Sequence, residues 1–178
     1  MIKIKNMVMI SVFTALMCIL TVFSPAIPIS LLKIAITLQT LIVMITGIML
    51  RPIDAFFSML LYIVLGAIGL PVFSNFQSGL SVIIGPNGGF IIAFPFAAFL
   101  ISLFKGNKSF WRLLTVNIIF GIVFVYILGT LSLSVVLKLR YCSTLISMTV
   151  FFIPDILKAL LAAATGYKLK QYKIYNAG

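Results

Sequence analysis

Long apolar runs separated by single basic residues or short polar stretches organise this chain. Residues 6–32, 34–50 and 113–137 carry no charge, and each run is flanked by Lys or Arg. An α-helix needs about 20 mostly apolar residues to cross the hydrocarbon core of a bilayer. Because prolines interrupt the first run near its end, the pattern predicts membrane spans at about 7–24, 34–50 and 113–137.

A fourth charge-free stretch follows Asp54 and continues to Phe104, which is too long for one helix. Its middle is rich in Gly, Pro, Ser and Asn, which interrupt helices and form turns. The stretch therefore divides into two spans joined by a loop. Together with the apolar run near the C-terminus, this completes six predicted spans. The three not yet given are at about 54–69, 89–104 and 145–167, with an outer loop at 70–88.

The composition supports this interpretation and excludes most other classes. Of 178 residues, 63% are hydrophobic and 8% are charged, whereas soluble domains carry roughly 25% charged residues. We therefore expect a single all-α membrane domain over residues 1–178. The 13 basic residues are scattered between apolar blocks, which disfavours nucleic-acid binding, since nucleic-acid-binding surfaces gather positive charge on one polar face.

Catalytic and metal chemistry lack the side chains they need. The chain has no histidine, two distant cysteines (Cys18 and Cys142) and two distant acids (Asp54 and Asp155). These residues form neither a zinc-ligand set nor the paired carboxylates that hydrolases use. We expect no metal, no cofactor and no enzymatic activity.

The basic residues indicate the orientation of the chain, because cytoplasmic loops are enriched in Lys and Arg. With six spans both termini lie on the same side. Placing that side in the cytoplasm assigns nine basic residues to it and three to the outer loops, whereas Lys158 falls inside a span. The cytoplasmic set is Lys3, Lys5, Arg51, Lys105, Lys108, Arg112, Lys168, Lys170 and Lys173, and the outer set is Lys33, Lys138 and Arg140.

Asp155 and Lys158 are the charged residues inside the last predicted span. Ionisable side chains within the bilayer are costly and mark functional sites. A spacing of three residues places both on one helical face. Lys158 lies ten residues before Lys168, or about 15 Å along a helix, so the pair belongs to the outer half of the membrane. It either binds a polar ligand or forms a self-satisfied structural ion pair.

The loop at 70–88 is predicted to lie on the same side of the membrane as this pair. It combines aromatic side chains (Phe73 and Phe76) with neutral hydrogen-bonding groups (Asn75 and Gln77). Irregular backbone near a membrane is tolerated where it lines a cavity. The loop is either a lid over a pocket or an ordinary flexible connector, and its apolar content favours a lid.

Other polar residues within the predicted spans have two interpretations each. Thr37, Gln39 and Thr40 at the start of the second span either line a pocket or bond back to their own helix backbone. Asn117 in the fifth span needs a partner in hydrocarbon, and a bridge between two helices is favoured slightly.

Four segments carry a resemblance to a known family, namely AITLQT (35–40), LGAIGLPVF (65–73), GPNGGF (85–90) and PDILK (154–158). The chain resembles the BioY family, the biotin-specific substrate-binding subunits (S components) of energy-coupling factor (ECF) vitamin transporters. The similarity extends from about residue 8 to residue 170. Its most specific parts are LGAIGLPVF and GPNGGF.

The resemblance implies a six-helix S-component fold in a prokaryotic cytoplasmic membrane, with a pocket that opens outward beneath loops. It also implies partnership with a transmembrane coupling subunit and two ATPases, and the chain itself has no phosphate-binding GxxxxGK[ST] segment. The first helix would dock the coupling subunit, and there Ser11 and Ala15 stand at the spacing of closely packed membrane helices.

Biotin suits the candidate residues chemically. Its ureido ring needs donors and acceptors, its thiophane ring an apolar wall and its carboxylate a cation. We expect Asp155 to accept from a ureido N–H, and Lys158 to neutralise either Asp155 or the biotin carboxylate. The alternatives are an S component for another vitamin and a membrane scaffold without transport activity. The full candidate ligand-binding set is Phe73, Asn75, Gln77, Gly88, Gly89, Phe90, Asp155 and Lys158.

Overall fold

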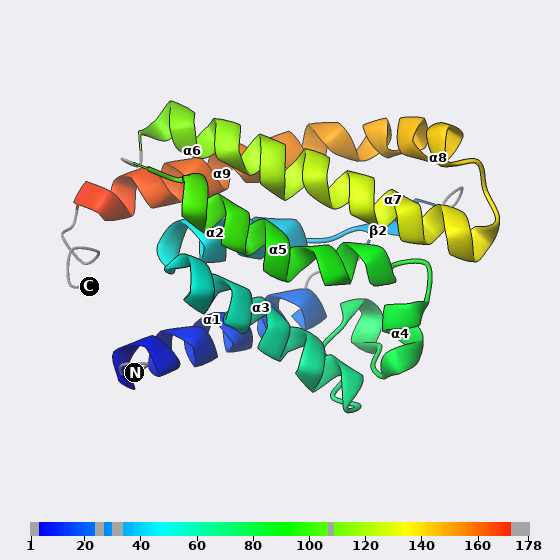
Figure 1. The fold of residues 1–178 in the computed structure, drawn as a ribbon, viewed down its shortest axis with the longest axis horizontal. Helices are drawn as coiled ribbons and strands as arrows, with labels where there is room; N and C mark the ends of the chain where they lie inside the picture. The colour runs from blue at the N-terminus through cyan, green and yellow to red at the C-terminus, as the bar shows by residue number, and fades with distance from the viewer. Residues whose placement is uncertain (1–3, 24–26, 30–33, 107–108, 172–178) are drawn as a thin grey trace.

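The computed structural model describes residues 4–23, 27–29, 34–106 and 109–171. Helices account for nearly all of its secondary structure, and one short pair of antiparallel strands lies between the first and second helices of the chain (Figure 1). In chain order the elements are α1 (Ile4–Phe23), β1 (Ile27–Ile29), β2 (Ile34–Ile36), α2 (Gln39–Met49), α3 (Pro52–Ala67), η1 (Ser74–Phe76), α4 (Leu80–Ile84), α5 (Gly88–Phe104), α6 (Phe110–Val116), η2 (Asn117–Val123), α7 (Phe124–Leu137), α8 (Tyr141–Ser147), η3 (Met148–Phe151) and α9 (Phe152–Gln171).

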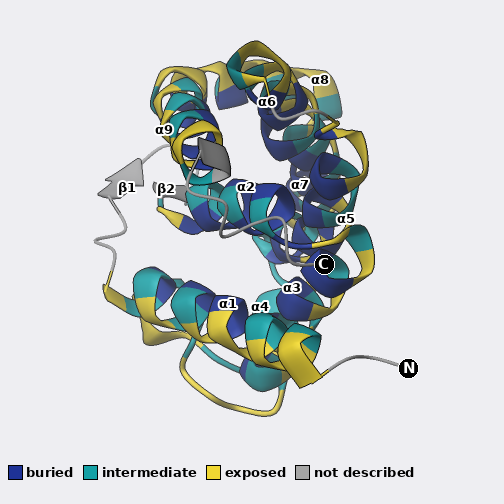
Figure 2. Cartoon of the chain, turned by 90° about the vertical axis from the view of Figure 1, so that its left-hand side faces the viewer, coloured by how far each residue is buried: buried dark blue, intermediate teal, exposed yellow. Residues whose placement is uncertain are grey.

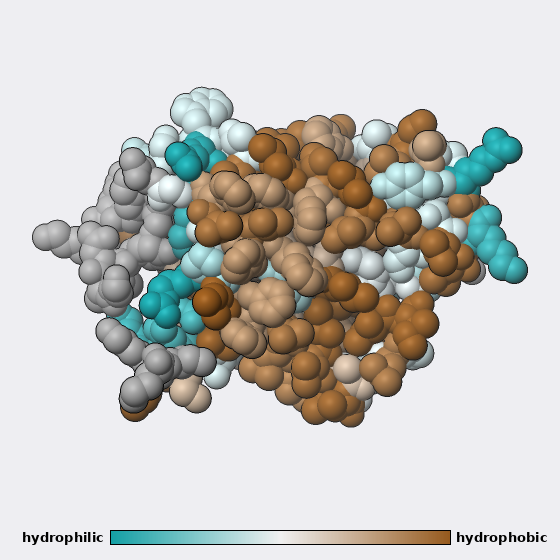
Figure 3. Space-filling model, in the orientation of Figure 1, coloured by the Kyte–Doolittle hydropathy of each residue, from teal (hydrophilic) through white to brown (hydrophobic). Residues whose placement is uncertain are grey.

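Three helical segments are long and apolar enough to cross a membrane, namely Ile4–Phe23, Phe110–Leu137 and Tyr141–Leu169. Three shorter apolar helices, α2, α3 and α5, complete the bundle. A broad hydrophobic surface covers the middle of the molecule in Figure 3. The fold is therefore an α-helical membrane fold, as the hydropathy pattern predicts.

The second predicted span requires a correction. The expected span at 34–50 is helical only from Gln39 to Met49, and Ile34–Ile36 forms a strand that pairs antiparallel with Ile27–Ile29. The β-branched residues in this segment favour extended backbone, and the preceding prolines disfavour helix. Hydropathy alone does not distinguish a helix from an apolar strand of this length.

Both of the longest helical segments change their winding midway. In the first, a π-helical stretch, Asn117–Val123, separates α6 from α7. In the second, the 3₁₀ turn Met148–Phe151 separates α8 from α9 just before Pro154. Proline cannot donate a backbone hydrogen bond, and its ring clashes with the carbonyl four residues earlier, which explains the second irregularity.

Helix α2 lies at the centre of the bundle, between α9 and α1 in Figure 2, and also packs against α5. Glycines permit this close packing. A Cβ at Gly47 would lie 2.7 Å from the Ile101 side chain on α5, and one at Gly166 would lie 2.5 Å from Ile48. Helix α1 begins and α9 ends at the same end of the bundle, whereas the hairpin, α4 and α8 lie toward the other end (Figure 1).

A buried lysine binds the C-terminus of α2. The Lys105 ammonium, at the end of α5, donates to the carbonyl oxygens of Gly47 at 3.3 Å and Ile48 at 3.0 Å, and also to that of Leu50. Ser102 donates to the Leu50 carbonyl at 2.6 Å. Cations at a helix C-terminus offset its partial negative charge, so Lys105 acts as a helix cap contributed by a neighbouring helix.

Replacing Lys105 by Met is expected to lower the free energy of unfolding by about 2–3 kcal/mol, because charge-assisted hydrogen bonds to buried carbonyls are lost. For a chain of this size that corresponds to a Tm roughly 5–10 °C lower. Thermal unfolding of the detergent-purified protein measures the change. Lys168→Met, at an exposed position on α9, is the matched control, and equal Tm values for the two variants would contradict the capping role.

Of the basic residues that predict the orientation, Lys3, Lys33, Lys108 and Lys173 lie outside the described residues. The ends of α5 and α9 and the starts of α1, α3 and α6 lie toward one end of the bundle, and the turn between α7 and α8 lies at the opposite end (Figure 1). The first group of segments carries Lys5, Arg51, Lys105, Arg112, Lys168 and Lys170, and the turn carries Lys138 and Arg140. The described members of the two sets therefore separate to opposite ends of the molecule.

Candidate functional site

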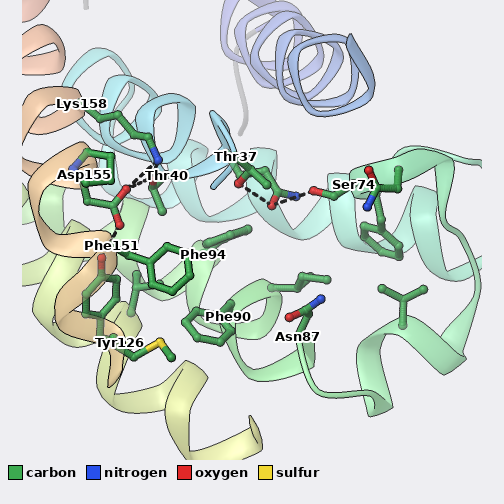
Figure 4. A pocket seen from close by; sticks show the side chains of 18 of the residues that line it. Thr37, Thr40, Ser74, Asn87, Phe90, Phe94, Tyr126, Phe151, Asp155 and Lys158 are labelled. Atoms are coloured by element: carbon green, nitrogen blue, oxygen red, sulfur yellow. Dashed lines mark hydrogen bonds and ion pairs between the residues drawn. The ribbon is translucent and has the colours of Figure 1, made fainter. Parts of the chain in front are cut away.

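A cavity of about 190 Å³ lies among α2, the loop between α3 and α5, α5 itself, α7 and α9. Figure 4 shows polar side chains at its two ends and aromatic rings between them. The cavity lies toward the end of the bundle that carries the hairpin, α4 and α8. This arrangement suits an elongated ligand with polar groups at both ends and an apolar middle.

The first polar end centres on Asp155, which is 5% exposed. Its carboxylate accepts hydrogen bonds from side chains of three helices: Lys158 on α9 at 2.7 Å, Thr40 on α2 at 3.1 Å and Tyr126 on α7 at 2.5 Å. A carboxylate can accept about four hydrogen bonds, so Asp155 can accept one more from a ligand. The Lys158 ammonium also donates to Thr40 Oγ1 at 3.3 Å, and Lys158 is 7% exposed.

Asp155 and Lys158 lie in the first two turns of α9, which begins at Phe152. Their spacing of three residues brings the two charges together on the face that looks into the cavity (Figure 4). A buried ion pair contributes little net stability, but removing either partner leaves a costly unpaired charge. The pair offers a ligand one acceptor and one donor side by side with no net charge.

Aromatic and aliphatic side chains form the middle of the cavity. Phe90 and Phe94 project from α5, and Phe151 comes from the 3₁₀ turn before α9 (Figure 4). Val125 and Met148 complete this wall. Such a surface binds the faces of an apolar ring system by burial and dispersion.

The second polar end is neutral. Gln39 Oε1 accepts hydrogen bonds from Thr37 at 3.2 Å and from Ser74 at 3.3 Å, and Gln39 Nε2 donates to the Tyr62 hydroxyl at 2.9 Å. This network connects the start of α2 to α3 and to the loop between α3 and α5. Asn75, Gln77 and Asn87 also line this end of the cavity.

The loop at 70–88 is ordered and anchored by Phe73, which is 1% exposed. The Phe73 ring packs edge-to-face on Tyr62, with ring centroids 5.5 Å apart, and lies against Gly66. The backbone N–H of Phe73 donates to the Gln77 carbonyl at 3.1 Å, and two of the residues between them, Asn75 and Phe76, adopt positive φ angles of 59°. This tight turn holds polar side chains over the cavity.

Gly88 and Gly89 do not line the cavity. They provide close packing at its edge instead. A Cβ at Gly88 would lie 1.7 Å from the Ile83 carbonyl oxygen on α4, and one at Gly89 would lie 2.6 Å from the Leu128 carbonyl oxygen on α7. Because these two residues have no side chain, the start of α5 can pack closely against both α4 and α7.

The structure brings most of the candidate residues together. Six of the eight candidate ligand-binding residues line one cavity, namely Phe73, Asn75, Gln77, Phe90, Asp155 and Lys158. Thr37, Gln39 and Thr40, for which two interpretations were open, line it too. Asn117 donates to the Ala159 carbonyl on α9 at 3.4 Å, which confirms the helix bridge. Ser11 and Ala15 are exposed on α1.

Sequence reasoning missed Tyr126, Asn87, Phe94 and Phe151. Tyr126 could have been found, since a tyrosine hydroxyl within an apolar span needs a hydrogen-bond partner. Asp155 is the only acid in the interior of a predicted span, because Asp54 is the first residue of the span at 54–69. The phenylalanines carry no such signal, because 16 of them are distributed along the chain. Among the described residues, no group of three or more acids or cysteines is placed to hold a metal ion.

Comparison with known proteins identifies relatives of the whole chain. A family model described as the BioY family matches residues 1–174. The chain is 38% identical over 175 residues to the probable biotin transporter BioY of Bacillus subtilis, covering 96% of this chain and 93% of that protein. It is 32% identical over 168 residues to the probable biotin transporter BioY of Pyrococcus horikoshii, covering 94% and 98% of the two chains.

The fold also matches a crystal structure of the S-component for biotin from an ECF-type ABC transporter. The TM-score is 0.91 at 30% sequence identity, covering 97% of this chain and 94% of the other. The two chains therefore share their architecture over nearly their full length.

Proposed function

The chain belongs to the BioY family, and from this premise we propose that it is the membrane subunit that captures biotin for uptake by an ECF-type transporter. It is a transport protein rather than an enzyme, and biotin is its transported ligand rather than a cofactor. The observation that carries the proposal is the cavity with a buried Asp155–Lys158 pair at one end, aromatic rings in the middle and neutral polar groups at the other.

The Asp155–Lys158 pair matches a ureido group, which presents N–H donors beside a carbonyl acceptor. Asp155 accepts from a ureido N–H, and Lys158 neutralises Asp155 while donating to the ureido oxygen. Phe90 and Phe73 contribute to the apolar wall around the thiophane ring and side chain. The carboxylate then lies at the neutral end, within reach of Asn75 and Gln77. This orientation leaves the ligand's charge nearest the mouth of the cavity.

We propose six membrane spans with both termini in the cytoplasm of a prokaryotic cell, within one domain of residues 1–178. Helix α2 has 11 residues, about 16 Å of helix, so residues 34–38 supply part of the second crossing. Their irregular backbone is tolerated because Thr37 lines the cavity. Labelling of single cysteines introduced at residues 5 and 139 in intact cells tests the orientation, and outside labelling at residue 5 would contradict it.

The partner is a transmembrane coupling subunit with two ATPases. The exposed face of α1 that carries Ser11 and Ala15 supplies a surface on which another helix can pack closely. Ser11→Leu and Ala15→Leu should then prevent co-purification with the coupling subunit and leave biotin binding intact. Normal assembly of both variants would contradict this docking face.

Biotin binding is the direct test of the function. The purified protein should bind biotin stoichiometrically, and mass spectrometry of denatured samples should find co-purified biotin. A thermal-shift panel of other vitamins separates the alternative that the chain is an S component for a different one. A membrane scaffold would give no shift with any of them, and uptake assays with and without the coupling subunits then test transport.

Tyr126→Phe is expected to weaken biotin binding about fivefold, because Asp155 loses one of the hydrogen bonds that orient its carboxylate, a loss of about 1 kcal/mol. Isothermal titration calorimetry measures the change. Tyr141→Phe is the matched control, since its hydroxyl donates to the Ile127 carbonyl in an exposed hydrogen bond and Tyr141 does not line the cavity. Equal affinities for the two variants would show that Tyr126 has no role in binding.

A further inference from the structure

Two exposed cations lie in the turn between α7 and α8. Lys138 ends α7 in the left-handed conformation, with φ 55°, and Arg140 immediately precedes α8. Within the described part of the chain, neither side chain has a hydrogen-bond or ion-pair partner. No neighbouring side chain therefore neutralises either charge, and the electric field of both extends into the surrounding solvent.

The turn lies near the mouth of the cavity. Ser132 on α7 donates to the Gly85 carbonyl at 3.3 Å, and Gly85 borders an outer hollow that shares Gln77, Val82 and Asn87 with the cavity. Lys138 lies six residues beyond Ser132, about 9 Å along the helix. Hydrophilic side chains project at this end of the molecule in Figure 3, where Figure 1 shows the α7–α8 turn.

Arg140, just before α8, lies at a similar distance from the cavity. Arg140 precedes the cavity-lining Met148 by eight residues, or about 12 Å of helix. The Debye length is about 10 Å at 0.1 M salt and about 30 Å at 0.01 M. At low ionic strength the field of both cations therefore extends over the mouth.

No acidic side chain opposes this field. The only acids in the chain are Asp54 and Asp155, and each is 5% exposed. Basic residues are enriched in the cytoplasmic loops of membrane proteins, whereas Lys138 and Arg140 belong to the proposed outer side. The orientation of the chain in the membrane therefore does not explain why they are present. An anion approaching the cavity meets only positive side-chain charge.

We propose that the Lys138–Arg140 turn is an anion-steering site that accelerates capture of the biotin carboxylate from outside. The inference rests on the proposed function. Steering acts on the diffusional encounter, so it raises the association rate and leaves the dissociation rate unchanged. The cations attract the ligand's charge without contacting it in the bound state.

Rapid-filtration kinetics with radiolabelled biotin and protein in nanodiscs of zwitterionic lipid test the inference. Lys138→Asn/Arg140→Gln should lower the association rate roughly threefold at 10 mM salt, and Lys138→Asp/Arg140→Glu roughly tenfold. Asn and Asp tolerate the left-handed backbone at residue 138, and removing outer cations reinforces the proposed orientation. Lys168→Gln, at the opposite end, is the matched control.

Three results would support steering together: a slower association rate in both variants, loss of the difference at 500 mM salt, and an unchanged dissociation rate. Neutral biotinamide should associate equally fast with all variants. Normal association of biotin with the reversed-charge variant at 10 mM salt would overturn the steering role alone. Absence of biotin binding to the unmodified protein would overturn the proposed function and the inference with it.

Discussion

Asp155→Asn is expected to weaken biotin binding by about a hundredfold. The substitution removes the charge that accepts the ureido N–H and leaves the buried Lys158 ammonium without its ion-pair partner. Charge-assisted hydrogen bonds contribute about 1.5–3 kcal/mol each, and every 1.4 kcal/mol of binding free energy is a factor of ten. Isothermal titration calorimetry on the purified protein measures the loss.

The chain contains a closely matched control for this experiment. Asp54 is also 5% exposed and also pairs with a basic residue three positions away, Arg51, at 3.0 Å. It lies at the start of α3, away from the cavity. Asp54→Asn should therefore keep the wild-type affinity. Equal Kd values for Asp155→Asn and Asp54→Asn would contradict the assignment of the site.

The same experiment distinguishes the two roles open to Lys158. If Lys158 serves the ureido end, Lys158→Gln weakens biotin and biotinamide by the same factor, because the carboxylate lies elsewhere. If Lys158 pairs with the biotin carboxylate, the variant weakens biotin and leaves biotinamide nearly unaffected. The double variant Asp155→Asn/Lys158→Gln removes the unpaired charge and keeps the measurement free of misfolding from a buried lone ion.

Gly88→Ala is expected to weaken biotin binding by about tenfold or more, through faster release. The new methyl group would overlap the Ile83 carbonyl oxygen, and a backbone atom cannot rotate away. Helix α4 must then shift off the end of α5, which opens the cover of the cavity. Overpacking of this kind costs about 1–3 kcal/mol. Dissociation kinetics with labelled biotin report the opening directly.

Gly166→Ala serves as the control for Gly88→Ala. Its methyl group would meet the Ile48 side chain in the packing between α9 and α2, at the end of α9 far from Asp155. We expect a lower Tm and an unchanged dissociation rate. Wild-type release from Gly88→Ala would show that α4 does not retain the ligand.

Much of the fold can be predicted from hydropathy, because a segment that crosses a membrane must satisfy its own backbone hydrogen bonds and therefore forms a helix. The ends of the long apolar runs predict α1 and α5 to within a few residues, since a charge or a proline marks each limit. The start of α2 was wrong because Ile34–Ile36 is as apolar as a helix and differs only in its backbone pairing. Pairing with β1 is a contact between two segments, which hydropathy does not encode.

Some residues of the candidate site could likewise be predicted from the sequence, and others could not. Asp155 and Lys158 were predictable because charge within a span is rare and costly. Their partners were harder, because Thr40 and Tyr126 come from α2 and α7, and contacts between distant segments follow from packing rather than local sequence. Gly88 and Gly89 were assigned to the ligand-binding set, but they do not line the cavity and permit close packing of α5 against α4 and α7.

The π-helical stretch Asn117–Val123 sets the angular phase between the two halves of its helix. An α-helix advances about 100° per residue, and wider π turns delay that rotation. Asn117 can thereby face α9 while Tyr126 faces Asp155. In a regular α-helix, the nine residues from Asn117 to Tyr126 would place the two side chains on opposite faces. The π-helical stretch instead lets both halves of one continuous helix present a hydrogen-bonding side chain to α9.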